Sequence, residues 1–99
     1  MAYEITFTKA VREQIQQLPG NVKAVAKRRI AELSSNPRLP RSKELDGHPN
    51  YYRLWLNNRY RLVWHIMDAD KVVEIEYVGP KTPDLYAYLG LARPSDMDS

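Results

Sequence analysis

Apolar and polar residues alternate on both sides of Asn57-Asn58, and this alternation predicts two strands joined by a tight turn. Successive side chains of a strand point to opposite faces, so one face of the hairpin collects the apolar set. That set, which we expect to form the core, consists of Tyr52, Leu54, Leu56, Tyr60, Leu62, Trp64 and Ile66. The other face, which we expect to be exposed, carries Tyr51, Arg53, Trp55, Arg59, Arg61, Val63 and His65.

The register of this hairpin follows from the length of its loop. A two-residue loop would place Leu56 opposite Arg59 and bury charge, which is costly. A three-residue loop or a bulge that includes Arg59 matches the apolar positions instead. The predicted pairs are then Leu56 with Tyr60, Leu54 with Leu62, Tyr52 with Trp64, and Trp55 with Arg61. The second face is therefore aromatic and cationic, which suits a phosphate backbone and stacked bases.

The N-terminal third predicts a strand followed by two helices. Residues 3–7 alternate as a strand, and Thr8 can cap a helix that ends at Pro19-Gly20. Asn21 can cap a second helix, which ends before Pro37 because proline disfavours helical geometry in the residue before it. Its inward residues would be Val22, Val25, Ala26, Ile30 and Leu33, and its outward residues include Lys23 and Lys27. We expect the two helices to cover one face of the sheet, with Lys23 and Lys27 available to phosphate.

The remainder of the chain predicts a loop, another strand and a short helix. Residues 38–50 lack periodicity and read as a loop in which Lys43 is a candidate nucleic-acid contact. A two-residue loop at Ala69-Asp70 leads into a strand that begins at Val73. This register pairs Ile66 with Val73, Trp64 with Ile75 and Leu62 with Tyr77, and it places Glu74 beside His65 and Glu76 beside Val63. Residues 79–83 break the strand, residues 84–89 predict a helix with Leu85 and Leu89 inward, and residues 91–99 read as a flexible tail.

These elements predict an α+β fold with a single domain over residues 1–90. An N-terminal strand and a helix hairpin pack on a mostly antiparallel four-stranded sheet, with a short C-terminal helix. The 99-residue chain is long enough for one core. The absence of cysteine excludes disulfides and fits the cytoplasm, and no apolar run approaches the roughly 20 residues that span a membrane.

The absence of several catalytic motifs excludes the classes of enzyme chemistry that depend on them. It has no glycine-rich phosphate loop, no His-Glu-x-x-His motif and no cysteine nucleophile. With two histidines and no cysteine, we expect no metal site and no cofactor. The arginine, lysine and tyrosine residues that remain can stabilise charge on phosphate and move protons when their pKa values are shifted. Such a set can promote cleavage of RNA through its own 2′-hydroxyl.

We expect His65 to be a hydrogen-bonded residue of the sheet rather than a general base. Glu74 and Glu76 have two possible roles: they either orient Arg53 and Arg61, or they lower the affinity for RNA.

A series of short motifs, in this order and spacing, resembles the RelE toxins of bacterial toxin-antitoxin systems. The resemblance runs from residue 1 to about residue 89. It is carried by Asn36-Pro37-Arg38, Leu45-Asp46-Gly47, Tyr52-Arg53-Leu54, Tyr60-Arg61-Leu62-Val63-Trp64, Val78-Gly79 and Tyr86.

The resemblance implies a ribosome-dependent endoribonuclease that cuts mRNA in the A site without a metal. Its partner would be a RelB-type antitoxin that wraps around the toxin in a hetero-oligomeric complex. Arg61 looks like the family's transition-state arginine, and Tyr86 looks like its C-terminal tyrosine. Arg53 stands in place of a lysine and Lys81 in place of an arginine that supports the leaving group. Trp55 stands where the family's best-known pattern has a second lysine, so it offers stacking in place of charge.

Two alternatives stay open at this point. The related ParE toxins share the fold and poison DNA gyrase by binding, without the catalytic residues, and the lack of a lysine at Trp55 leans that way. Arg61 and Tyr86 favour the nuclease. The other alternative is a weakly active relative that keeps antitoxin binding.

Overall fold

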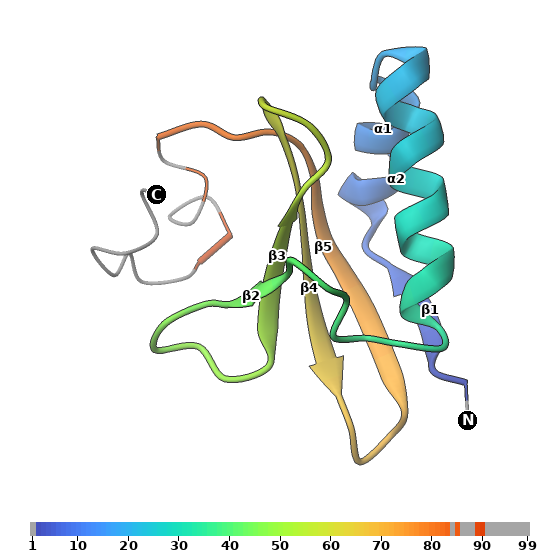
Figure 1. Ribbon diagram of the computed structural model, residues 1–99, viewed down its shortest axis with the longest axis vertical. Helices are drawn as coiled ribbons and strands as arrows, with labels where there is room; N and C mark the ends of the chain where they lie inside the picture. The colour runs from blue at the N-terminus through green and yellow to red at the C-terminus, as the bar shows by residue number, and fades with distance from the viewer. Residues whose placement is uncertain (1, 84, 86–88, 91–99) are drawn as a thin grey trace.

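The computed structural model describes residues 2–83, 85, 89 and 90, and within them a five-stranded sheet forms the centre of the fold (Figure 1). The strands lie in the spatial order β1-β5-β4-β3-β2. β1 pairs in parallel with β5, and every other pairing is antiparallel. The strands are β1 (Glu4–Phe7), β2 (Lys43–Glu44), β3 (Tyr51–Trp55), β4 (Tyr60–Met67) and β5 (Val72–Pro80). The α+β class is confirmed.

The strand that was not expected is β2, because it lies within residues 38–50, for which the sequence predicts a loop. Lys43 pairs with Arg53 and Glu44 with Tyr52, so β2 extends the sheet at the edge of β3. Both of its residues are exposed, and two residues are too few to show an alternation. The sheet therefore has one strand more than the four that were expected, and the additional strand is the short β2 at its edge.

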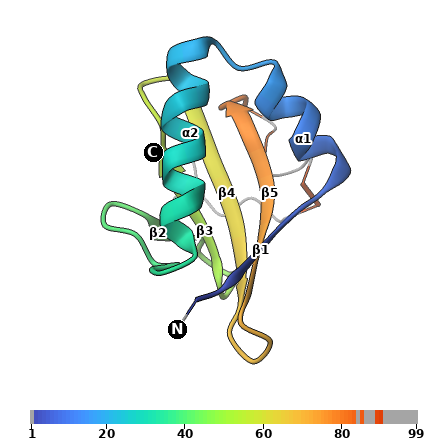
Figure 2. The same ribbon diagram turned by 90° about the vertical axis from the view of Figure 1, so that its right-hand side faces the viewer.

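Two helices follow β1 and lie over one face of the sheet (Figure 2). α1 (Lys9–Gln16) begins after Thr8, whose hydroxyl oxygen accepts a 3.3 Å hydrogen bond from the Val11 N–H as expected. α2 (Gly20–Leu33) begins one residue before the expected cap Asn21, and Pro19 occupies the N-cap without a side-chain hydrogen bond. The prediction of an Asn21 cap is therefore wrong. Neither of these helices is long and apolar enough to cross a membrane.

The core lies between the two helices and the sheet. Val22, Ala26, Ile30 and Leu33 of α2 are buried and Val25 is partly buried, as predicted. The sheet contributes Leu54, Leu56, Leu62, Trp64, Ile66, Val73, Ile75 and Val78 to the same cluster. The buried Trp64 ring donates a 2.9 Å hydrogen bond from Nε1 to the Pro37 carbonyl, which ties the segment after α2 to the centre of the sheet.

The β3–β4 hairpin has the predicted register. Tyr52 lies opposite Trp64, Leu54 opposite Leu62, and Trp55 opposite Arg61. In the turn, Asn57 Oδ1 accepts hydrogen bonds from the backbone N–H groups of Arg59 at 2.8 Å and Tyr60 at 3.1 Å. This side-chain-to-backbone turn stabilises the three-residue loop.

The β4–β5 register is correct only near its turn. Ile66 pairs with Val73, His65 with Glu74 and Trp64 with Ile75 as expected, but the next pairs are Val63 with Tyr77 and Leu62 with Val78. A β-bulge leaves Glu76 without an opposite residue, so the expected Leu62–Tyr77 and Val63–Glu76 pairs are wrong. The bulge turns Val78 into the core, where it is 1% exposed, and turns Tyr77 to the other face. β5 also continues to Pro80, beyond the expected break.

The sheet face away from the helices is partly covered, contrary to the expectation of an exposed face. Leu45, Val63 and Leu85 form a second buried cluster there, with Tyr51, Tyr77 and Leu89 packed against it. Leu85 and Leu89 thus point inward as predicted. The rest of the expected helix over residues 84–89 and the tail over residues 91–99 lie outside the described residues.

Candidate functional site

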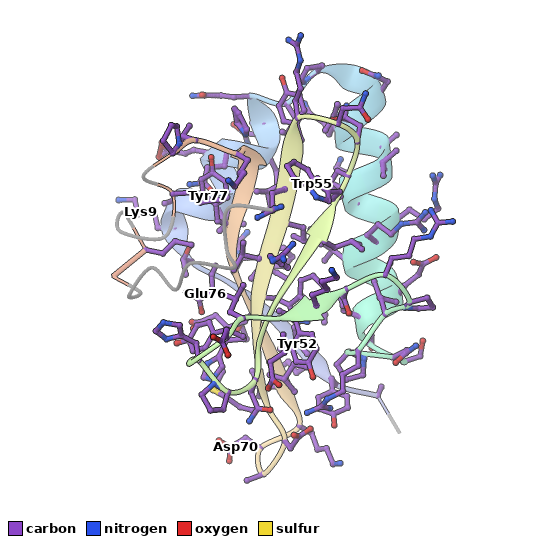
Figure 3. The ribbon with its side chains drawn as sticks, turned by 60° about the vertical axis from the view of Figure 1, so that its left-hand side comes forward. Lys9, Tyr52, Trp55, Asp70, Glu76 and Tyr77 are labelled. Carbon is purple, nitrogen blue, oxygen red and sulfur yellow. The ribbon has the colours of Figure 1, made fainter. Side chains whose placement is uncertain are left out.

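Arg61 and Trp55 form a cross-strand pair on the sheet face away from the helices. The Arg61 guanidinium carbon lies 4.0 Å from the centroid of the Trp55 ring, within cation–π range. Arg61 is fully buried at 0% exposure, whereas Trp55 is 41% exposed. Figure 3 looks onto this face and shows Trp55 projecting from β3. A ligand therefore meets the indole before it meets the guanidinium.

Basic side chains gather beside Trp55 at the edge of the sheet. Arg53 lies between Val63 on β4 and Lys43 on β2, and it is 9% exposed. Arg41, Lys43, Arg53 and Trp55, with Leu54, line a hollow of about 140 Å³. The structure thus brings together three of the predicted residues, Lys43, Arg53 and Trp55.

Arg41 also lines this hollow, although it is not among the site residues that the sequence predicts. It is exposed and adopts a left-handed backbone conformation with φ of 72°, which is uncommon for a residue with a side chain. Its position in the basic stretch between Arg38 and Lys43 was the available signal. That stretch lacks periodicity, so the sequence alone could not give the direction of the side chain.

The other predicted residues lie in different places. Lys81 follows β5, and its backbone N–H donates a 2.9 Å hydrogen bond to the Arg59 carbonyl beside the β3–β4 turn. Tyr86 lies outside the described residues. Lys23 and Lys27 belong to α2, which covers the opposite face of the sheet (Figure 1). The fold therefore does not bring these two lysines to the hollow beside Trp55.

A second group of polar residues lies nearer the β4–β5 turn on the same face as Arg53 and Arg61. His65 stacks on Tyr51, with ring centroids 4.1 Å apart and planes 7° apart, and it lies opposite Glu74. Burial, a hydrogen bond with Glu74 and the charge of Glu74 raise the pKa of Glu76 to about 8. Burial raises the pKa of Tyr51 as well, with a further contribution from the charges of Glu76 and Glu74. The two glutamates thus interact with each other and lie close to the His65 ring.

The Trp55 region combines a stacking surface with fixed positive charge. Arginine stays protonated at any physiological pH, and its planar guanidinium matches phosphate oxygens. An exposed indole stacks on bases of any sequence. The geometry therefore suits a single-stranded nucleic acid whose backbone runs along the basic edge of the sheet.

The comparison with known sequences identifies the family. The mRNA interferase toxin RelE of Escherichia coli K12 is 30% identical to this chain over 82 residues, which is 82% of this chain and 85% of that protein. The chain belongs to the RelE family. No family model matches the sequence.

Solved structures agree with membership of the RelE family. A mutant of E. coli toxin RelE in the free state superposes with a TM-score of 0.74 at 28% identity, covering 88% of this chain and 93% of that chain. A chain of the intact E. coli RelBE toxin-antitoxin complex gives a TM-score of 0.72 at 29% identity, covering 82% of this chain and 99% of its own length. The RelE-like fold thus extends over 82–88% of this family member.

Proposed function

We propose that this RelE-family chain is the toxin of a type II toxin-antitoxin system and that it cleaves mRNA on the ribosome. The observation that carries the proposal is the pairing of Arg61 with Trp55 beside the basic hollow that contains Arg53 and Lys43. The curated relative is itself named an mRNA interferase. The proposed enzyme inhibits translation in the cytoplasm, where ribosomes and mRNA are present.

In the proposed reaction the 2′-hydroxyl of one nucleotide attacks the adjacent phosphorus and the 5′-oxygen of the next nucleotide leaves. A bond from the 2′-oxygen to phosphorus forms as the bond to the 5′-oxygen breaks. The 2′-hydroxyl loses its proton to water, the leaving 5′-oxygen takes up a proton from water, and the products are a 2′,3′-cyclic phosphate and a 5′-hydroxyl. Arg61 stabilises the charge that develops on the phosphorane, and Arg53 holds a phosphate oxygen. By the family resemblance, Lys81 supports the leaving group and Tyr86 stacks on or activates the substrate.

The burial of Arg61 adds a conformational step to this proposal. A phosphate oxygen cannot contact a guanidinium that is 0% exposed, so the covering side chains must move first. The Trp55 ring, 4.0 Å from Arg61, is one of these covers. We infer that an entering base displaces the indole, which exposes Arg61 only when substrate is bound.

A RelB-type antitoxin is the proposed protein partner. The RelE structures that resemble this chain include a toxin-antitoxin complex from E. coli. An antitoxin that wraps around this chain in a hetero-oligomeric complex would block access of the ribosome to the face that carries Trp55. Co-expression with the protein encoded beside this gene tests this partner, and failure of the two to co-purify would contradict it.

The function is tested by adding the purified protein to ribosomes that translate a defined mRNA and mapping the cuts by primer extension. Wild type should cut, and Arg61→Lys, which keeps charge but loses the guanidinium fork, should cut on the order of 10²-fold more slowly. Arg28→Ala is the matched control, because Arg28 is an exposed arginine of α2 on the other side of the sheet. It should cut at the wild-type rate.

The gyrase alternative is tested with the same preparations in a DNA supercoiling reaction. Inhibition of supercoiling without mRNA cleavage would replace the nuclease proposal with a ParE-like one. Cleavage that is equal for wild type and Arg61→Lys would remove Arg61 from the reaction. The absence of both activities would leave a relative that only binds its antitoxin.

A further inference from the structure

We propose that His65, Glu74 and Glu76 form a binding site for a divalent transition-metal ion of the Zn²⁺ class. One potential ligand atom from each of these residues lies within 4.8 Å of the other two. All three side chains are partly buried. The proposal does not depend on RNA cleavage, and it departs from our expectation that the sequence holds no metal site.

The backbone of β4 and β5 brings the three residues together. His65 and Glu74 are directly opposite each other in the antiparallel register. Glu76 is the bulged residue of β5, and the bulge leaves its side chain close to the other two. Ligands on adjacent strands are held more rigidly than ligands on loops, which lowers the cost of organising a metal site.

The donor set favours zinc over the common alkaline-earth ions. Three protein ligands drawn from imidazole and carboxylate groups, with one open position, are typical of zinc sites with access to solvent. Magnesium prefers oxygen ligands alone in octahedral geometry. A tetrahedral zinc site with bonds of about 2.0–2.2 Å places its donor atoms roughly 3.3–3.6 Å apart. The potential ligand atoms lie within 4.8 Å of one another, and rotation of the two glutamate side chains can bring them to this separation.

The electrostatics of the site also favour a cation. Glu74 and Glu76 lie close together, and their carboxylates repel each other when both are charged. A divalent ion between the two carboxylates would neutralise both charges.

The imidazole is held in place by a neighbouring aromatic ring. Tyr51 stacks on His65 at 4.1 Å with nearly parallel planes, and His48 packs edge-on against Tyr51 at 6.3 Å. Packing that fixes the orientation of a ligand ring strengthens metal binding.

The test is isothermal titration calorimetry with Zn²⁺ on the full chain, together with thermal unfolding at the same metal concentrations. Wild type should bind one Zn²⁺ per chain, and its unfolding temperature should rise with Zn²⁺ but not with millimolar Mg²⁺. His65→Phe keeps a ring against Tyr51 and removes the ligand nitrogen, and Glu76→Gln keeps the side-chain size and removes the charge. Each variant should weaken Zn²⁺ binding by about 100-fold or more, since even lost outer-shell partners cost about 10–100-fold.

Glu13→Gln is the matched control for Glu76→Gln, because Glu13 is an exposed glutamate of α1 on the other side of the sheet, and it should bind Zn²⁺ as wild type does. Circular dichroism of each variant establishes that it folds. Absence of Zn²⁺ binding by wild type at about 100 µM would overturn the proposal, because sites of this class bind far more tightly. Equal binding by wild type, His65→Phe and Glu76→Gln would also overturn it, as would loss of binding in Glu13→Gln.

Discussion

Replacement of Arg61 by methionine should separate stability from activity in this protein. Arg61 is fully buried with its guanidinium carbon 4.0 Å from the centroid of the Trp55 ring. Methionine is also unbranched and fills much of the same space, and its sulfur can contact the indole. The substitution removes the charge while leaving a side chain against Trp55.

The expected magnitudes follow from these contacts. Loss of the cation–π contact lowers the free energy of unfolding by about 0.5–2 kcal/mol, and a new sulfur–aromatic contact raises it by about 0.3–1.5 kcal/mol. Methionine also avoids the desolvation of a buried charge, so Arg61→Met should be less destabilised than a variant that leaves a cavity at this position. Arg61→Ala leaves a cavity and should lose roughly 2–5 kcal/mol. Both variants should lose on the order of 10²–10³ in cleavage rate.

Urea unfolding followed by circular dichroism gives the free energies of unfolding, and primer extension on ribosomes gives the cleavage rates. Trp55→Phe is a useful companion, because it keeps an aromatic ring against Arg61 and should retain most of the cleavage. The reasoning fails if Arg61→Met is destabilised as much as Arg61→Ala, which would make the interactions of the guanidinium, and not the packing of the side chain, the main contribution of Arg61 to stability. It also fails if Arg61→Met cleaves mRNA at the wild-type rate.

Three further predictions concern the fold. Gly79→Ala should destabilise by about 1–3 kcal/mol in urea unfolding, because its methyl would lie 2.9 Å from the Tyr77 hydroxyl, and less in a Tyr77→Phe background. Trp64→Phe should cost roughly 1–3 kcal/mol by the same assay, since the Pro37 carbonyl loses its buried 2.9 Å hydrogen bond. Asp68 has a lowered pKa, chiefly through its hydrogen bond to Arg38, so its stabilisation holds above the unfolded pKa and disappears as pH falls through the folded one. The melting temperatures of wild type and Asp68→Asn should therefore differ at pH 7 and converge in acid; a constant difference would contradict this.

The register of the central hairpin could be predicted because its two faces differ so strongly. Shifting β3 by one residue would place Leu54 opposite Arg61 and mix charged with apolar side chains on the face that packs against the helices, which is costly. The same pattern predicted the inward residues of α2. Alternation decides a register wherever one face is clearly apolar.

Other features depend on contacts that the local sequence does not encode. β2 is two exposed residues whose strand geometry depends on pairing with β3. An arginine is usually exposed, so the residue type predicts that Arg61 lies on the surface. Trp55 and the second apolar cluster instead bury it. The hollow beside Arg53 likewise depends on the path of the loop that carries Arg41, which has no periodic signal.

The bulge at Glu76 links these observations, because it decides which side chains reach the sheet face away from the helices. A regular β5 would continue its alternation from Ile75, so Tyr77 would enter the core and Val78 would face away from the helices. The extra residue reverses both, placing Tyr77 opposite Val63 and Gly79 opposite Arg61. Gly79 has no side chain, and the Tyr77 phenol occupies the space where one would lie. One inserted residue thus separates the arginine–tryptophan pair from the histidine–glutamate cluster, and the same sheet face can hold both groups of opposite charge.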